Sequence, residues 1–558
     1  MHPAMEEPDN AALAPFYYRD NYLRLCDTVE AQYGDILNDA ERTILQSFRH
    51  LNFNAQCLYV RLISRTGPWF RESKLVYAEL GPISPILDEL LAHEMIEEAT
   101  ELMPQELGKL FTRNELQQLF WSPDQPEPAD KPALLRAIEQ LQRSAADTLQ
   151  TLTALDSRRI IAPRGIELTQ HLQLLFFGNR QQSLTDFVLQ DLGLTHYYPY
   201  LLDRDHRLFS CREALEEFVA CAALSDTHCA LLDAGQHEHL PALAAQLLPM
   251  SIRFTSSEKR WYRLCNNLAR DLERIDEHEI ALQLYSRSLR HPARERRARI
   301  LEGAGDWAGA LVLCEEIINQ PWCEAENEAA ERILPRVKRK LDGSRLSRRR
   351  DAFAQMTLTL VRGSGSVEQQ AATFLKQQWQ AVHYVENALM STLFGLAFWE
   401  QIFEAVPGVF HNPFQSAPTD MYESAFRERR KDSLATRMMQ LREQDLAIIL
   451  VDAYQRYHHY ACRWTHWRHI SLALVSACVH VIPAAHLLAI WERMLFDPAE
   501  NRRGFPDLIA LGAEAGEYCL IEVKGPGDAL QDSQKRWLRY FQANDIPAQV
   551  GWVVWCDD

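Results

Sequence analysis

Hydrophobic residues follow two different patterns along the chain. Over the N-terminal two-thirds they recur at helical spacing, as around Ile44 and Phe48, with few strand signals. Near the C-terminus, Leu508–Leu511 and Tyr518–Val523 form two apolar runs joined by a short glycine-containing loop, which predicts an antiparallel β-hairpin. An amphipathic segment and a further apolar run, Val550–Trp555, predict a helix and a returning strand. The pattern therefore predicts a multidomain, mostly α-helical chain with a C-terminal α/β domain.

The predicted hairpin carries charged residues where a buried strand normally has none. Asp507 opens the first run, and Glu522 and Lys524 belong to the end of the second. Because strand side chains alternate between faces, Glu522 and Lys524 share one side, about 7 Å apart. Buried charges are costly unless they are paired or bind a metal ion, and two carboxylates suit a hard cation such as Mg²⁺ or Mn²⁺. The alternative is an exposed edge strand on which Glu522 and Lys524 form a solvated pair.

The segment before the hairpin predicts a domain boundary and a long helix. Gly363–Ser366 indicates a flexible break, and a helix is expected from Val367 to Ala405, with Glu386 inside it. Periodicity alone does not distinguish Glu386 from other helical glutamates. Residues 258–341 contain a weak repeat at an offset of 29 residues, which predicts helix pairs similar to tetratricopeptide hairpins. Such pairs build a concave surface, suited here to DNA or to a protein partner.

Two shorter patterns indicate modules in the N-terminal part. Residues 104–142 follow the order helix, proline-rich connector, helix, which is similar to the SAP DNA-binding module, although a plain helical hairpin fits as well. Residues 55–91 fit a small winged-helix-like element or an all-helical support domain. The predicted parts are an N-terminal helical domain (1–100), a SAP-containing domain (101–250), a helical-repeat domain (251–366) and the C-terminal α/β domain (367–558).

The acidic composition does not by itself exclude a nucleic-acid partner. The chain of 558 residues has a net charge of −17, but residues 251–350 contain 21 basic and 16 acidic residues. The basic residues concentrate between Arg336 and Arg350, where they form either a phosphate-binding patch or a solvated helix surface. No apolar segment has the length of a membrane span, the N-terminus lacks the order of a signal peptide, and the 12 cysteines include no C-x-x-C pair. These features predict a cytoplasmic protein without a membrane partner.

A histidine-rich segment raises a second metal hypothesis. His458, Cys462 and His466 fall at i, i+4 and i+8, which on a helix places them on one face. Structural zinc sites commonly use four ligands, and no second segment supplies the others. A helix that packs on the sheet or lines a cleft is the alternative, and the sequence leaves open whether this segment binds metal.

Longer motifs around the hairpin resemble a known family. Arg502–Asp507 (RRGFPD), Glu522–Asp528 (EVKGPGD) and the helix that follows look like the VRR-NUC domain of the PD-(D/E)xK nuclease superfamily. Pro413–Asp420 (PFQSAPTD) and the helix around Glu386 are similar to the Fanconi-associated nuclease branch, and a weaker resemblance covers nearly the whole chain. Eukaryotic members carry a ubiquitin-binding zinc finger whose Cys/His cluster this sequence lacks. The resemblance therefore implies a compact, bacterial member of the family.

The resemblance also implies a catalytic site. The groups that would hold one or two Mg²⁺ or Mn²⁺ ions are Glu386, Asp507, Glu522 and the backbone carbonyl of Val523. Lys524 would orient or activate the attacking water. The residues that would contact the DNA backbone or support the site are Arg502, Arg503 and Gln534.

The implied function is a structure-selective DNA nuclease that acts on 5′ flaps and branched DNA. It would combine endonuclease activity with 5′-to-3′ trimming of the phosphodiesterase I type and act in interstrand-crosslink repair, in the bacterial nucleoid or in a eukaryotic nucleus. Two other classes stay open at this stage. One is a restriction-like or Holliday-junction-resolving nuclease, and the other is a non-catalytic helical-repeat scaffold. The sequence names no protein partner.

Overall fold

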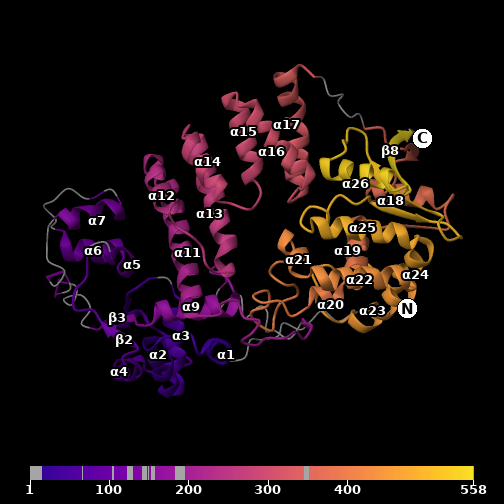
Figure 1. The fold of residues 1–558 in the computed structure, drawn as a ribbon. Helices are drawn as coiled ribbons and strands as arrows, with labels where there is room; N and C mark the ends of the chain where they lie inside the picture. Colours follow the sequence, from indigo (N-terminus) through magenta and orange to yellow (C-terminus); the bar gives the residue numbers. More distant parts are fainter. Residues whose placement is uncertain are drawn as a thin grey trace. The chain divides into compact units, whose positions relative to one another are not determined.

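The computed structural model describes residues 16–65, 67–103, 106–121, 128, 130–140, 147–148, 150–151, 158–182, 195–344 and 351–556. The chain divides into two compact units, Met1–Leu194 and Thr195–Asp558 (Figure 1). Helices dominate both units, and a five-stranded sheet occupies the C-terminal part of the second. The predicted fold class is confirmed.

The first unit is helical with one small antiparallel sheet. Its strands follow the order β1-β3-β2, so the strand nearest the C-terminus of this unit is central. Arg159, beside β3, pairs with Glu72 and Asp88 at 3.0 and 2.5 Å, which ties that strand to its surroundings. The elements are α1 (Tyr17–Tyr33), α2 (Asp39–His50), α3 (Phe53–Ile63), β1 (Phe70–Arg71), α4 (Ile83–Ala92), β2 (Ile96–Glu98), α5 (Leu107–Leu110), α6 (Arg113–Phe120), α7 (Lys131–Gln140), β3 (Ile160–Pro163) and α9 (Ile166–Phe177).

The helix pair expected between residues 104 and 142 is present as α6 and α7. Leu116 and Phe120 of α6 share a core with Leu134 and Ile138 of α7. The side chain of Asp130 accepts a hydrogen bond from the Ala133 amide at 2.7 Å and so caps the first turn of α7. Most of the connector between the two helices lies outside the described residues, and binding of DNA by this pair stays a prediction.

A row of helices opens the second unit (Figure 1). Consecutive helices pack on one another from α13 to α17, as expected for a repeat of helix pairs. Because α11 and α12 share a core with α13, the helical layer begins before the predicted boundary at residue 250. The helices are α11 (Arg212–Asp233), α12 (Leu240–Leu247), α13 (Thr255–Arg274), α14 (His278–Ser286), α15 (Ala293–Ala304), α16 (Trp307–Asn319) and α17 (Glu324–Asp342).

The basic patch is partly neutralised within the protein. Arg336 lies 2.7 Å from Glu302, and Lys338 lies 3.3 Å from Glu315. The residues of the patch that fall outside the described part are Arg345, Arg348, Arg349 and Arg350. Binding of phosphate by this region stays a prediction.

The C-terminal sheet follows the order β4-β8-β7-β6-β5, with β4 and β7 parallel to β8 and the remaining pairs antiparallel. Its strands are β4 (Gln355–Val361), β5 (Ala381–Tyr384), β6 (Leu508–Leu511), β7 (Tyr518–Lys524) and β8 (Ala548–Cys556). Helix α18 (Val367–Leu375) covers one face, and α19 (Glu386–Ala397), α25 (Ala484–Phe496) and α26 (Asp532–Ala543) pack on the other. The predicted hairpin, helix and returning strand are thus β6–β7, α26 and β8. Strand β4 precedes residue 367, so the sheet begins before the predicted domain boundary.

The single long helix expected from Val367 to Ala405 is wrong. The segment folds as α18, β5 and α19, followed by the short α20 (Trp399–Ile402). Strand β5 forms because Ala381–Tyr384 pairs antiparallel with Leu508–Leu511, a contact across more than a hundred residues that local periodicity does not reveal. This break places Glu386 at the start of a helix and next to the sheet.

The remaining helices complete the core around Trp399, Trp464 and Trp491, which are almost fully buried. They are α21 (Ser424–Arg429), α22 (Lys431–Glu443), α23 (Leu446–Tyr457) and α24 (Leu472–Val481). In the described residues no single helix is long and apolar enough to cross a membrane, although α24 and α25, which meet at 111°, pass that test as a pair.

Candidate active site

The hairpin brings two carboxylates together at one edge of the sheet. The register pairs Leu508 with Ile521, so Asp507, the residue before β6, lies opposite Glu522 of β7. The Asp507 Oδ2 atom accepts a hydrogen bond from the Val523 amide at 2.9 Å, which fixes the side chain across the strand. Glu522 is only 1% exposed, and every residue of β7 is buried. The exposed edge strand considered from the sequence is therefore wrong.

Glu522 has donors on one carboxylate oxygen and none on the other. The Lys524 ammonium lies 2.8 Å from Oε1, and the Gln534 side-chain amide donates to the same oxygen at 2.5 Å. The second oxygen, Oε2, is buried without a hydrogen-bond partner. A buried carboxylate oxygen left unpaired beside a second carboxylate is a costly arrangement in the absence of a cation.

The electrostatics of this pair favour a bound cation. Burial, and then the neighbouring Asp507 carboxylate, raise the pKa of Glu522 to about 7, although the Lys524 ammonium opposes the shift. Burial also raises the pKa of Asp507, against the hydrogen bond from the Val523 amide and the charge of Lys524. A divalent ion would offset both the desolvation and the mutual repulsion, and carboxylate oxygens are the ligands that Mg²⁺ and Mn²⁺ prefer. The residues present fit such an ion.

Glu386 lies beside this pair, and its charge contributes to the raised pKa of Asp507. The backbone amides of Val385 and Glu386 donate to the Asp507 carbonyl at 2.9 and 3.0 Å, which joins the start of α19 to the start of β6. The Glu386 carboxylate is exposed and accepts hydrogen bonds from the Tyr384 hydroxyl at 2.8 Å and the Asn387 amide at 3.2 Å. Within the described part of the chain, no three His, Cys, Asp or Glu side chains form a compact ion-binding group. Binding of an ion by Glu386 therefore stays a prediction.

Glu386 is also held in a strained backbone conformation. Its φ of 38° is in the left-handed region, which residues other than glycine adopt rarely and at a cost of about 1–3 kcal/mol. The two hydrogen bonds that the Val385 and Glu386 amides donate to the Asp507 carbonyl offset this cost. Strained residues of this kind cluster at functional sites, in agreement with the place of Glu386 next to the carboxylate pair.

The comparison with known proteins decides the family. Residues 441–555 match the VRR-NUC domain, and residues 16–97 match the helix-turn-helix domain described as "FAN1, HTH domain". The Fanconi-associated nuclease 1 homolog of Pseudomonas aeruginosa is 33% identical over 97% of this chain and 96% of its own length. The chain belongs to the Fanconi-associated nuclease family. It is therefore a nuclease, and its VRR-NUC domain is of the metal-dependent PD-(D/E)xK type.

Other members of the Fanconi-associated nuclease family are more distant. The human protein is 24% identical over 96% of this chain, which spans 62% of the human protein's length, and the chain spans 61% of the rice homolog. The crystal structure of paFAN1 bound to 5′ flap DNA with a two-nucleotide flap and a gap superposes with a TM-score of 0.80 at 32% identity, and the match covers 100% of both chains. The expected bacterial type of Fanconi-associated nuclease agrees with these matches.

The family motif Arg502–Asp507 also fixes the helix that supports Glu522. The Arg503 carbonyl accepts a hydrogen bond from the Trp537 indole at 2.9 Å, and the Phe505 ring packs against the same indole at a centroid distance of 4.1 Å, with the two planes tilted by 30°. Arg502 lies over the Tyr422 ring at 4.4 Å, whereas the Arg503 side chain is exposed. The structure thus gives Gln534 a supporting position in the site, and DNA contacts by Arg502 and Arg503 stay predictions.

Replacing Asn387 by alanine is expected to weaken the link between α19 and this motif. The Asn387 Oδ1 atom accepts a hydrogen bond from the buried Phe505 amide at 3.2 Å, and the variant leaves that amide without a partner. We expect the free energy of unfolding to fall by about 1–3 kcal/mol and cleavage to slow by about tenfold. Urea denaturation and single-turnover kinetics measure both. Asn387→Asp keeps the acceptor oxygen, so equal losses in the two variants would contradict this role.

A further acidic residue near this nuclease site has no signal in the sequence. Glu368, in the first turn of α18, contributes a negative charge that raises the pKa of both Asp507 and Tyr384. From the sequence alone it is an ordinary first-turn acid next to a Ser366–Gln369 capping box. Its role depends on the fold, because α18 covers the sheet beside β6 and β7.

The His458–His469 segment is not helical. Helix α23 ends at Tyr457 and turns follow, so the spacing of His458, Cys462 and His466 does not place them on one face. Cys462 is buried, which raises the pKa of its thiol to about 12, and His466 is exposed. The helix was predicted from the i, i+4, i+8 spacing of these residues, whereas the hydrogen bonds of the segment reach α19, as in the bond from the His466 amide to the Thr392 hydroxyl.

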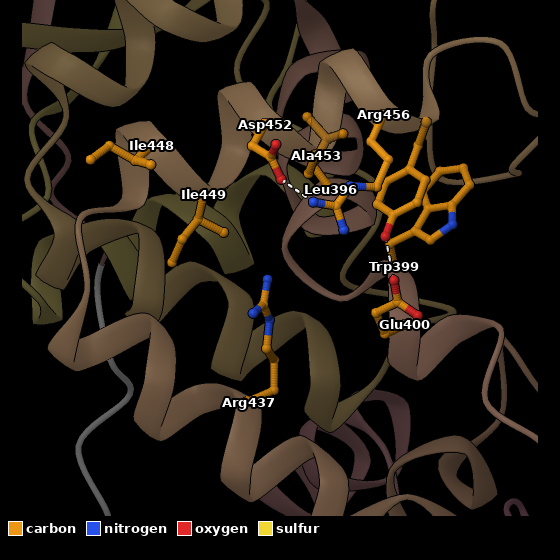
Figure 2. Close-up of a pocket in the computed structure, with 10 residues that line it drawn as sticks. Leu396, Trp399, Glu400, Arg437, Ile448, Ile449, Asp452, Ala453 and Arg456 are labelled. Carbon is orange, nitrogen blue, oxygen red and sulfur yellow. Dashed lines mark hydrogen bonds and ion pairs between the residues drawn. The ribbon is translucent and has the colours of Figure 1, made fainter.

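Two other polar groups lie apart from the nuclease site. Asp420 is buried against Arg430, whose guanidinium is 2.9 Å from its carboxylate, so its role is an internal ion pair. A cavity of about 340 Å³ lies beside α19, α22 and α23, and the residues that line it include Arg437 and Asp452 (Figure 2). The charged groups there are paired, since Arg456 binds Asp452 and Arg437 donates to the Ala397 carbonyl. None of the proposed metal ligands lines this cavity.

Proposed function

We propose that this chain cleaves DNA at 5′ flaps and branched ends, as a structure-selective endonuclease with 5′-to-3′ trimming activity of the phosphodiesterase I type. The observation that carries the proposal is the unpaired Oε2 atom of Glu522, buried opposite Asp507 and beside Lys524. The relative paFAN1, at 32% identity over the full chain, has been crystallised on 5′ flap DNA. A role in interstrand-crosslink repair, in association with DNA in the cytoplasm of a bacterium, completes the proposal.

One or two Mg²⁺ or Mn²⁺ ions would be held by Asp507, Glu522, the Val523 carbonyl and Glu386. When bound, such an ion supplies Lewis acidity at the scissile phosphate. The Lys524 ammonium donates a hydrogen bond to Glu522 Oε1 at 2.8 Å and leaves two further N–H donors for a water molecule or a phosphate oxygen. Gln534 holds Glu522 from α26, and the Val523 amide holds Asp507 from the strand itself. The chain thus supplies a preorganised acidic edge with one cationic donor.

Side-by-side cleavage of 5′ flap, 3′ flap, nicked duplex and four-way junction DNA, with Mn²⁺ or Mg²⁺ in excess, tests the proposal. We expect the 5′ flap to be cut fastest and plain duplex slowest. Symmetric paired incision of the junction, or sequence-selective cutting of duplex, would favour the resolving or restriction-like class. Absence of cleavage in both metals, with DNA binding intact, would favour the scaffold.

A further inference from the structure

We propose that Trp552 is a stacking platform for a nucleobase next to the scissile phosphate. The proposal rests on the proposed nuclease function, because it places the ring beside Lys524. In the sheet, Lys524 of β7 is the register partner of Trp552 of β8. Register partners on neighbouring strands project to the same face and are about 4.8 Å apart. The ring therefore belongs to the face that carries Glu522 and Lys524.

The strands on this side of the site extend beyond the protein that covers them. Strand β7 ends at Lys524, whereas β8 and β4 remain paired as far as Cys556 and Val361. Helix α26 covers part of the same face, and its Arg539 pairs at 2.7 Å with Asp351, which lies four residues before β4 begins. Beyond it, Val554 and Val361 are 49% and 54% exposed.

The opposite face of β4 and β8 is covered, so the extended part of these strands is exposed on one face only. Leu358, Leu360 and Val553 are buried in the core under α18, and Trp555 packs against that core. The bare face carries Thr357 and Thr359, both exposed, with Trp552 between the threonines and the carboxylate pair. Strands β4 and β8 therefore present an aromatic ring and two hydroxyls in direct continuation of the acidic edge.

Trp552 is held in place without using its ring faces. Its indole N–H donates to the Gln355 side chain at 3.1 Å, which anchors the edge of the ring on β4. Among the described residues no aromatic ring or cation stacks on it, and Trp552 is only partly buried. A fixed aromatic face at the end of a catalytic strand is suited to an unpaired base, since every base offers a π-face and stacking is sequence-tolerant. A flap junction supplies such a base at the point of cleavage.

The test uses the full-length protein and 5′ flap DNA with 2-aminopurine placed in turn at each nucleotide around the cleavage site. EDTA removes the metal ions and so prevents cleavage. Under these conditions we expect the 2-aminopurine fluorescence at one position to be quenched by wild type and by Trp552→Phe but not by Trp552→Leu. With Mn²⁺, Trp552→Leu should raise KM by about tenfold and change kcat little, because stacking of this kind contributes to binding of substrate and transition state alike.

Trp555→Leu is the matched control, since it removes an indole from the same strand on the other face. We expect it to keep the quenching and the wild-type KM at temperatures where melting curves show all variants folded. Three results would overturn the proposal. Trp552→Leu could quench the fluorescence as strongly as wild type, or the two leucine variants could have equal effects. The third is that wild type forms a concentration-dependent dimer that Trp552→Leu loses. A wild type that quenches the base but cuts no DNA would leave the platform in place and refute the nuclease function alone.

Discussion

Cleavage of flap DNA by Glu522→Gln is expected to fall by about a thousandfold or more, with the fold intact. The glutamine keeps an oxygen that can accept from Lys524 and Gln534, so the hydrogen bonds that hold the side chain remain possible. It removes the charge that a divalent ion needs, and several kcal/mol of transition-state stabilisation depend on that ion. Single-turnover cleavage with Mn²⁺ at pH 8, where a glutamate with a pKa of about 7 is ionised, measures the loss.

Thermal stability gives this prediction a second readout. Without metal, the variant should melt no lower than wild type, because the substitution removes a buried charge opposed to Asp507. Wild type should gain about 2.7 kcal/mol of stability at a Mn²⁺ concentration 100 times the Kd, whereas Glu522→Gln should gain much less. Glu514→Gln, in the exposed loop of the same hairpin, is the control and should behave as wild type. Full cleavage by Glu522→Gln would contradict the proposed site.

The hairpin could be predicted from the sequence because its signals are local. Two short apolar runs around a glycine-containing loop define β6 and β7, and the charges at Asp507, Glu522 and Lys524 contrast with their apolar neighbours. A one-residue shift in register would move Glu522 to the other face, so the pattern of burial fixes which residues meet. The family motifs added Glu386, which no local pattern distinguishes.

The parts that the sequence did not predict depend on distant contacts. Strand β5 is four residues long and is stabilised by its pairing with β6. The helical spacing of the hydrophobic residues around it therefore predicted one continuous helix. Trp552 looked like an ordinary residue of a buried strand, because nothing in the sequence shows that β8 extends past the end of β7. Glu368 acts on the pKa of Asp507 only because α18 packs on the sheet. Contacts between residues far apart in the sequence determine the structure around each of these residues.

Gly504→Ala is expected to damage the site through the helix that supports it. Gly504 has a φ of 83°, and a Cβ atom there would lie 2.7 Å from the Ser533 carbonyl carbon and 2.8 Å from its Cβ. Ser533 precedes Gln534, which donates to Glu522, so relief of the clash displaces the start of α26 together with that donor. Backbone strain and overpacking together should lower the free energy of unfolding by about 2–5 kcal/mol.

Activity should fall by about a hundredfold in Gly504→Ala, because a shift of about 1 Å in a supporting group is enough to misplace a catalytic carboxylate. Gly516→Ala separates strain from displacement: Gly516 has a φ of 87°, but a Cβ atom there would meet nothing within 4 Å. Both variants adopt an unfavourable backbone, and only Gly504→Ala moves α26. We therefore expect Gly516→Ala to lose about 1 kcal/mol of stability and to keep wild-type kinetics. Equal activity in the two variants, measured well below their melting temperatures, would show that the position of α26 does not control Glu522.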